Sequence, residues 1–134
     1  MNKMKAPFME ILGVKIIEAK DGYAKLSMPY KKELTNPYGR LHGGTIMTLA
    51  DSAIAVAVNS KYTHPFYTRE LKIKFKSSVE NGFVIAEARL VGQKKNFVYG
   101  KVEVKSDKGE LLAEVSATFV VPKEKEGVEE NQNA

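Results

Sequence analysis

The sequence predicts an α+β domain in which one antiparallel sheet curls around one buried helix. Three observations lead to this fold class: a hairpin pattern at residues 14–29, a nearly all-apolar helical pattern from Gly43 to about Lys61, and four strand patterns within 67–121. The chain has 134 residues and 43% hydrophobic content, which is enough for one domain with a sizeable core. We expect a single domain over residues 1–121.

The first part of the chain predicts a short helix or turn at 8–13, followed by the hairpin. Gly13 closes the first segment, and Asp21-Gly22 is a strong hairpin turn signal. Residues 30–42 are rich in turn formers and predict an ordered loop.

The helical pattern after this loop is apolar nearly all round. Ile46, Leu49, Ala53 and others recur at helical spacing with no proline among them, and Ala55 and Val56 fill the other side. A helix of this kind is usually buried within a domain.

Four strand-like segments follow the helix, separated by turn signals. In the first of them, Leu71, Ile73 and Phe75 alternate with charged residues, so one face is apolar and the other is solvated. The regular spacing predicts an antiparallel meander. The segments are 67–76, 83–91, 97–105 and 111–121, with turns at Asn81-Gly82, Gly92–Asn96 and Ser106–Gly109.

Composition excludes several classes of protein. There is no cysteine, so disulfides and thiolate sites are absent. The N-terminus lacks the apolar core of a secretory signal, and no run approaches the roughly 18 apolar residues that span a membrane. The charge of +5 is spread along the chain rather than clustered as in nucleic-acid-binding proteins. We expect a cytoplasmic protein with neither nucleic-acid nor membrane partners, and a charged, disordered tail at 122–134.

The most informative stretch runs from Asn36 to Asp51, where a polar, glycine-containing loop leads into the apolar helix. Asp51 lies among small and apolar residues, and an acid there costs free energy unless it is paired or used. It is either an acid that faces solvent or bonds a hydroxyl such as Ser52 or Thr48, or it is the base or nucleophile of an acyl-transfer site.

Gly43 and Gly44 stand at the expected start of the helix. They either allow the chain to bend from the loop into the helix, or they leave backbone N–H groups open to a ligand oxygen at the positive end of the helix dipole. His42, just before them, is either structural or a general base. Neither metal-ligand spacing nor a serine nucleophile motif is found in the sequence, so we expect no metal site and no serine-hydrolase mechanism.

The spacing of Gly43 and Asp51 has a geometric consequence. Eight residues along a helix correspond to roughly 12 Å, so one small carbonyl group cannot touch both. If both act on one thioester, they come from two subunits whose helices run antiparallel. The motif therefore predicts a two-fold symmetric homodimer with shared active sites.

This arrangement resembles the hotdog-fold acyl-CoA thioesterases, in particular the phenylacetate-degradation (PaaI-like) branch of the 4-hydroxybenzoyl-CoA thioesterase-like superfamily. The resemblance covers roughly residues 8–121. It rests on the motif Asn36-x-x-Gly39-x-Leu41-His42-Gly43-Gly44-x₄-Leu49-x-Asp51, on Thr68-x₆-Phe75, and on Asp107-x-Gly109, Ala113 and Thr118-Phe119.

The resemblance implies a role for each matching residue. Asp51 is expected to activate water as a general base, or to act as the nucleophile. The N–H of Gly43 in the partner subunit is expected to polarise the thioester carbonyl, while Gly44 shapes the turn. Thr68 stands where the family commonly has a hydroxyl residue that orients the water.

Further residues are expected to hold the loop and the substrate. Asn36 and His42 would hold the loop and help to place the carbonyl or the water. Family members commonly hold the nucleotide with basic side chains near the subunit surface, and Lys94, Lys95 and Asn96 are the candidates here. The resemblance also implies a continuous sheet across a dimer, with dimers commonly paired into a homotetramer.

The sequence thus predicts an acyl-CoA thioesterase that releases a free acid and coenzyme A. No cofactor is expected, since coenzyme A is part of the substrate. One alternative is a non-catalytic hotdog domain that binds acyl-CoA. A third interpretation, a hotdog hydratase or dehydratase, depends on His42 acting with an acid.

Overall fold

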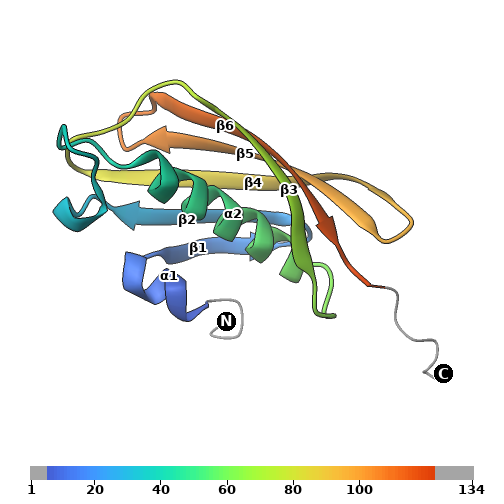
Figure 1. Cartoon of the computed structure of the whole chain (residues 1–134). Helices are drawn as coiled ribbons and strands as arrows, with labels where there is room; N and C mark the ends of the chain where they lie inside the picture. The colour runs from blue at the N-terminus through green and yellow to red at the C-terminus, as the bar shows by residue number, and fades with distance from the viewer. Residues whose placement is uncertain (1–5, 123–134) are drawn as a thin grey trace.

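The computed structural model describes residues 6–122, which form a six-stranded antiparallel sheet and one long helix (Figure 1). The elements in chain order are α1 (Pro7–Leu12), β1 (Lys15–Lys20), β2 (Tyr23–Pro29), the 3₁₀ turn η2 (Lys32–Leu34), α2 (Gly43–Asn59), β3 (Tyr67–Phe75), β4 (Phe83–Lys94), β5 (Phe97–Ser106) and β6 (Leu111–Val120). Each predicted helix and strand is present. The predicted disordered tail lies outside the described residues, apart from Pro122. No helix within 6–122 has the length and apolar character needed to cross a membrane.

Helix α2 lies across one face of the sheet and contacts all six strands (Figure 1). Its buried side chains form the centre of the core together with the inward-facing residues of β2, β4, β5 and β6. They are Ile46, Leu49, Ala50, Ala53, Ile54, Val56, Ala57 and Val58. The predicted fold class, a curved antiparallel sheet wrapped around one long helix, is confirmed.

The strand order is β1-β2-β4-β5-β6-β3, so the predicted meander is wrong for β3. β3 pairs with β6, at the opposite edge of the sheet from β1. The edge of β4 that a meander would give to β3 is occupied by β2, which pairs with β4 from Tyr23↔Arg89 to Pro29↔Phe83. The connection from β3 to β4 therefore crosses the sheet, and β3 is left as an edge strand.

The hairpin between β4 and β5 is tighter than the sequence predicted. The turn expected at Gly92–Asn96 contains two more pairs of the ladder, Gln93↔Val98 and Lys94↔Phe97. An irregularity in register between Leu90 and Gly92 lets pairing continue past the glycine. Lys95 then reverses the chain in the left-handed conformation, with φ of 57°.

Helix α2 packs tightly against β5 at Gly100. A Cβ atom at this glycine would overlap the side chain of Ile54, with the Ile54 Cγ1 atom 2.7 Å away. Ile54 is completely buried and has no free space to turn into. The absence of a side chain at Gly100 therefore sets how closely α2 approaches the sheet.

We expect Gly100→Ala to destabilise the protein by about 1–3 kcal/mol, because the added methyl group overpacks the core against Ile54. Ile54→Val shortens the opposing side chain and should recover part of this loss in the double variant. Urea unfolding of the two single variants and the double variant measures the coupling. Strictly additive effects would show that the two residues do not oppose each other.

Candidate active site

The loop before α2 is held in place by Asn36. Its side-chain Oδ1 accepts hydrogen bonds from the backbone N–H groups of Tyr38 (2.9 Å) and Arg40 (3.1 Å). Its backbone N–H donates to the carbonyl of Arg40 over 2.7 Å. The Arg40 side chain in turn donates to Ser78 O, in the connection after β3, over 2.6 Å. The predicted ordered loop is therefore tied both to itself and to the β3–β4 connection.

His42 caps the N-terminus of α2. Its Nδ1 atom accepts a hydrogen bond from the backbone N–H of Gly44 over 2.8 Å. The ring that makes this contact uses the Nδ1 lone pair, so this nitrogen is occupied by the helix cap. Of the two glycines, only Gly43 has a backbone N–H without a partner among the described residues. The ring of Phe75, at the end of β3, lies against this glycine, 3.4 Å from where a Cβ would stand.

Asp51 is on the side of α2 that faces β3. The hydroxyl of Thr68, at the beginning of β3, donates a hydrogen bond to Asp51 Oδ1 over 2.8 Å. Burial raises the pKa of the Asp51 carboxyl above its ordinary value, and the hydrogen bond from Thr68 opposes this rise by stabilising the charged form. The result is a half-buried carboxylate with a raised proton affinity, fixed in orientation by a neighbouring strand.

Asp51 opens into a cavity of about 620 Å³ between α2, α1 and the segment before β3. Half of its lining residues are apolar and come mainly from α1 and the segment before β3, where the ring of Phe66 packs against Phe119 with ring centroids 5.6 Å apart. The polar lining residues are Thr48, Asp51, Ser52 and Asn59 on α2, and Thr63 and His64 before β3. The lining residues on α2 are Thr48, Asp51, Ser52, Ala55 and Asn59, and on α1 Phe8 and Met9. An acyl or aryl group fits such a cavity, with the carboxylate at its wall.

Gly43 and Asp51 lie at different positions along α2, and β3 contacts the helix at both of them. Thr68 at the beginning of the strand contacts Asp51, while Phe75 at its end lies against Gly43. β3 therefore runs antiparallel to α2. Within one chain, the carboxylate and the free N–H group are held apart by a rigid helix.

Lys94, Lys95 and Asn96 occupy the tip of the β4–β5 hairpin, away from Asp51 along the chain but at the end of the sheet where β3 begins. The pairs Phe97↔Val120 and Tyr67↔Val120 establish this neighbourhood. Both lysines are exposed, and Asn96 accepts a backbone hydrogen bond from Val121 through its carbonyl (2.8 Å). The three residues form a basic tip beside the edge strand, and they do not contact Asp51.

Comparisons with known proteins show the family to which the chain belongs. Residues 38–113, more than half of the chain, match the thioesterase superfamily. The chain belongs to the thioesterase superfamily.

Individual relatives of this thioesterase share most of its length. A putative esterase of Archaeoglobus fulgidus is 36% identical over 81% of this chain and 71% of its own. The 1,4-dihydroxy-2-naphthoyl-CoA hydrolase of Listeria monocytogenes is 24% identical over 87% and 96%. The solved structure of a mutant of the phenylacetic acid degradation protein PaaI from Thermus thermophilus superposes with a TM-score of 0.81, at 30% identity over 87% and 100%. The predicted hotdog, PaaI-like thioester hydrolase is thereby confirmed as to family, fold and class of enzyme.

The sequence did not identify several of the residues that line the cavity of this thioesterase. Asn59 and Phe66 were not identified as site residues, although Asn59 follows Asp51 and Ala55 at intervals of four along α2. This spacing places the three side chains along one side of the helix and is a signal that the sequence contains. Phe66 has no such signal, because the connection that positions it has no regular period. Among residues 6–122, no three acidic or histidine side chains gather as a metal site would require.

The hydrogen bond between Thr68 and Asp51 should affect the pH dependence of thioester hydrolysis. If Asp51 is the general base, it accepts a proton only when ionised, and kcat/KM should fall as the pH drops through its pKa, which burial raises above the ordinary value. Thr68→Val removes the bond that favours the carboxylate, and the acid limb should move to higher pH. Thr118→Val is the control, because it makes the same change on β6 with a side chain on the face of the sheet opposite α2. An acid limb that stays in place in Thr68→Val would remove Asp51 as the titrating group.

Proposed function

We propose that this thioesterase hydrolyses an acyl- or aryl-CoA thioester to the free acid and coenzyme A, in active sites shared between two subunits. The observation that carries the proposal is the half-buried Asp51, bonded to Thr68 and open to a cavity with apolar side chains on one side. A carboxylate with raised proton affinity suits a general base. The two relatives with an esterase and a CoA hydrolase name support the same chemistry.

In the proposed reaction Asp51 takes a proton from a water molecule whose oxygen attacks the thioester carbon. The carbonyl π electrons move to oxygen, and the resulting oxyanion is stabilised by the N–H of Gly43 of the partner subunit. Collapse of the tetrahedral intermediate breaks the C–S bond, and the proton held by Asp51 passes to the departing thiolate. Direct attack by Asp51 through a mixed anhydride is the alternative, with water entering in a second step.

The role of Gly43 is supported by what surrounds its N–H group. His42 already occupies the N–H of Gly44, so one free donor is presented at the helix start. This donor stands at the positive end of the α2 dipole, where negative charge on a ligand oxygen is stabilised. In this proposal His42 and Asn36 are positioning residues, because one caps the helix and the other shapes the loop that leads to it.

The free edge of β3 supports the shared site. Antiparallel pairing of β3 with β3 of a second subunit would extend the sheet without a break. The end that carries Thr68 would then lie beside the partner's end that carries Phe75, and Asp51 would approach Gly43 of the partner subunit. Tyr67 and Phe75, at the two ends of the strand, are 59% and 50% exposed, and pairing would cover both.

The acyl group is assigned to the cavity beside Asp51. Its apolar walls and volume of about 620 Å³ suit an aromatic or medium-sized acyl group. The names of two relatives, a dihydroxynaphthoyl-CoA hydrolase and a phenylacetic acid degradation protein, favour an aryl substrate. The cytoplasmic location expected from the sequence stays a prediction.

Complementation between two inactive variants tests the shared site. Asp51→Asn removes the base and should lower kcat by about 10²–10⁴-fold. Gly43→Pro removes the N–H group, and proline is tolerated at the first helical position. His42 already has φ −63° and ψ 141°, the conformation that a residue before proline adopts. Co-expressed in equal amounts, the two variants should regain about a quarter of wild-type thiol release, because half of the dimers are hybrids with one intact site.

Each outcome of this experiment has a definite meaning. If both groups acted within one chain, no hybrid would contain an intact site, and the mixture would stay inactive. Normal hydrolysis by Asp51→Asn would remove Asp51 from the mechanism. A broad acyl-CoA panel that showed binding without thiol release would favour the non-catalytic alternative, and hydration of an enoyl-CoA would favour a hydratase.

The basic hairpin tip is proposed to hold the phosphates of coenzyme A. We expect the double variant Lys94→Glu, Lys95→Glu to raise KM for a CoA thioester at least tenfold and to leave kcat nearly unchanged, since the tip does not contact Asp51. KM for a short thioester that lacks the nucleotide should not change. Each single variant, Lys94→Glu or Lys95→Glu, is also compared with Lys108→Glu in the exposed turn after β5, which makes the same change in net charge. An equal effect on both substrates would contradict phosphate binding at the tip.

A further inference from the structure

The cavity beside Asp51 has two unlike walls. One wall is formed by α2, whose lining side chains are polar except for Ala55. The other wall is formed by α1 and the segment before β3, and it includes the aromatic rings of Phe8 and Phe66. An acyl group that extends from Asp51 into this cavity therefore has its main apolar contacts on the side of α1 and the segment before β3.

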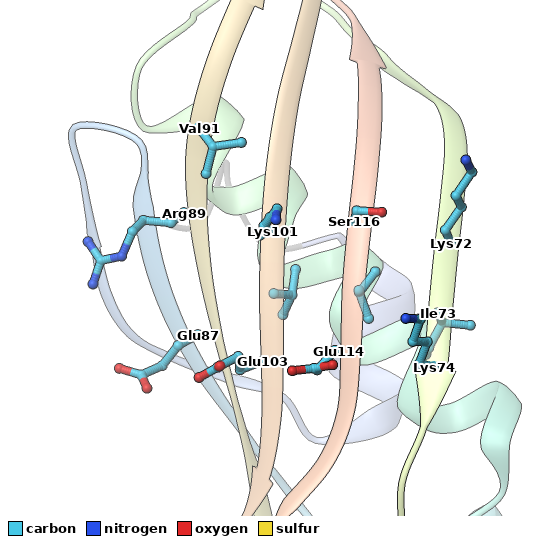
Figure 2. A pocket seen from close by; sticks show the side chains of 12 residues that line it. Lys72, Ile73, Lys74, Glu87, Arg89, Val91, Lys101, Glu103, Glu114 and Ser116 are labelled. Atoms are coloured by element: carbon cyan, nitrogen blue, oxygen red, sulfur yellow. The ribbon is translucent and has the colours of Figure 1, made fainter.

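A second hollow, of about 810 Å³, lies on the face of the sheet opposite α2. Figure 2 looks onto this hollow and shows charged side chains from β3, β4, β5 and β6 around it, among them Arg89, Lys101 and Glu114. None of its lining residues belongs to the candidate active site. An apolar acyl group would displace water from these charges at a cost in free energy, so the cavity beside Asp51 is the better place for it.

Helix α1 is short, but its position is fixed from its C-terminal half. Met9 and Leu12 are buried in the core, and Gly13 ends the helix in the left-handed conformation, with φ of 76°. The ammonium group of Lys31, beyond β2, donates a hydrogen bond to the carbonyl of Ile11 over 3.2 Å. The side chains of α1 that point away from the core are therefore presented in set directions.

Two large apolar side chains of α1 are exposed, and they differ in what they face. Phe8 is 56% exposed and lines the cavity beside Asp51, whereas Ile11 is 70% exposed and does not line it. Burying the exposed part of a phenyl ring against an apolar ligand is favourable, because it removes apolar surface from water. Phe66 supplies a second ring on the same wall and is itself packed against Phe119.

We propose that Phe8 is a specificity-determining residue, which packs against the acyl group of the substrate and favours an aromatic one. The inference rests on the proposed function, and it gives a role in substrate selection to α1, which carries none of the proposed reacting groups. A flat aromatic acyl group can stack on, or meet edge to face, the rings of Phe8 and Phe66, and such ring pairs are stabilised beyond the area that they bury. An alkyl chain gains only the burial.

The contribution of Phe8 concerns binding and not the chemical step. Its ring contacts the acyl group, which is the same in the substrate and in the transition state, while the charge that develops on the thioester is met elsewhere. A contact that is equally strong in both states lowers KM and leaves kcat unchanged. Selection by Phe8 is therefore separable from catalysis by Asp51 in steady-state kinetics.

Kinetics of Phe8→Ala with phenylacetyl-CoA, hexanoyl-CoA and acetyl-CoA test this role. We expect KM for phenylacetyl-CoA to rise about tenfold with kcat nearly unchanged, because the apolar contact is lost. KM for acetyl-CoA should not change, since one methyl group fills little of the cavity. Phe8→Leu keeps an apolar contact without the ring, so it should restore KM for hexanoyl-CoA and only part of KM for phenylacetyl-CoA.

Ile11→Ala is the matched control, because it removes an exposed apolar side chain from the same helix away from the cavity. It should leave KM for all three substrates unchanged. Thermal unfolding identifies a Phe8→Ala protein that fails to fold, and Phe8→Leu then decides. An equal rise in KM for all three substrates, an effect of Ile11→Ala as large as that of Phe8→Ala, or a wild type that prefers hexanoyl-CoA would each overturn the role of Phe8.

Ala55→Leu separates this inference from the proposed function. The larger side chain fills the cavity from the α2 wall and should raise KM for phenylacetyl-CoA. If Ala55→Leu has this effect and Phe8→Ala has none, the role of Phe8 is wrong while the cavity remains the acyl site. If neither variant changes KM, the acyl group lies elsewhere, and both the inference and the assignment of the cavity are wrong.

Discussion

The packing of α2 against the sheet, with Ile54 against β5 at Gly100, places the candidate site residues of the helix. With no Cβ at this glycine, Ile54 fits against the strand and the helix lies deep in the curve of the sheet. Asp51, one turn before Ile54, then faces β3 at the distance of a single hydrogen bond from Thr68. At the N-terminal end of α2, the loop held by Asn36 and Arg40 places the first residue of the helix beside Phe75. The reactive groups are therefore fixed by core packing and need no contact with each other.

Asp51 illustrates the conflict between stability and chemistry in this core. A half-buried carboxylate costs folding free energy, and only one described side chain, Thr68, donates to it. More donors would stabilise the charge and lower the proton affinity that a general base needs. In the proposed mechanism, a carboxylate with few hydrogen-bond donors keeps the proton affinity that the base needs, and the buried apolar residues of α2 stabilise the helix that carries it.

The sequence predicted where the helices and strands lie, but it did not predict which strands pair with each other. Hydrophobic periodicity and turn residues located each helix and strand, since these signals are local. The pairing of β3 with β6 has no local signal, because the spacing of turns does not say which edge a strand joins. For His42, the sequence allowed a base or a structural residue, and only the position of the Gly44 N–H identifies the cap.

The pairing of β3 with β6 has a consequence for how the site is held together. Thr68 pairs with Phe119 on the final strand, so the residue that bonds Asp51 is placed by a contact between distant parts of the chain. Thr68 also bonds the central helix, so it joins the helix to the last strand of the sheet. A substitution that weakens the β3–β6 ladder would therefore disturb the surroundings of Asp51 without changing any residue of α2.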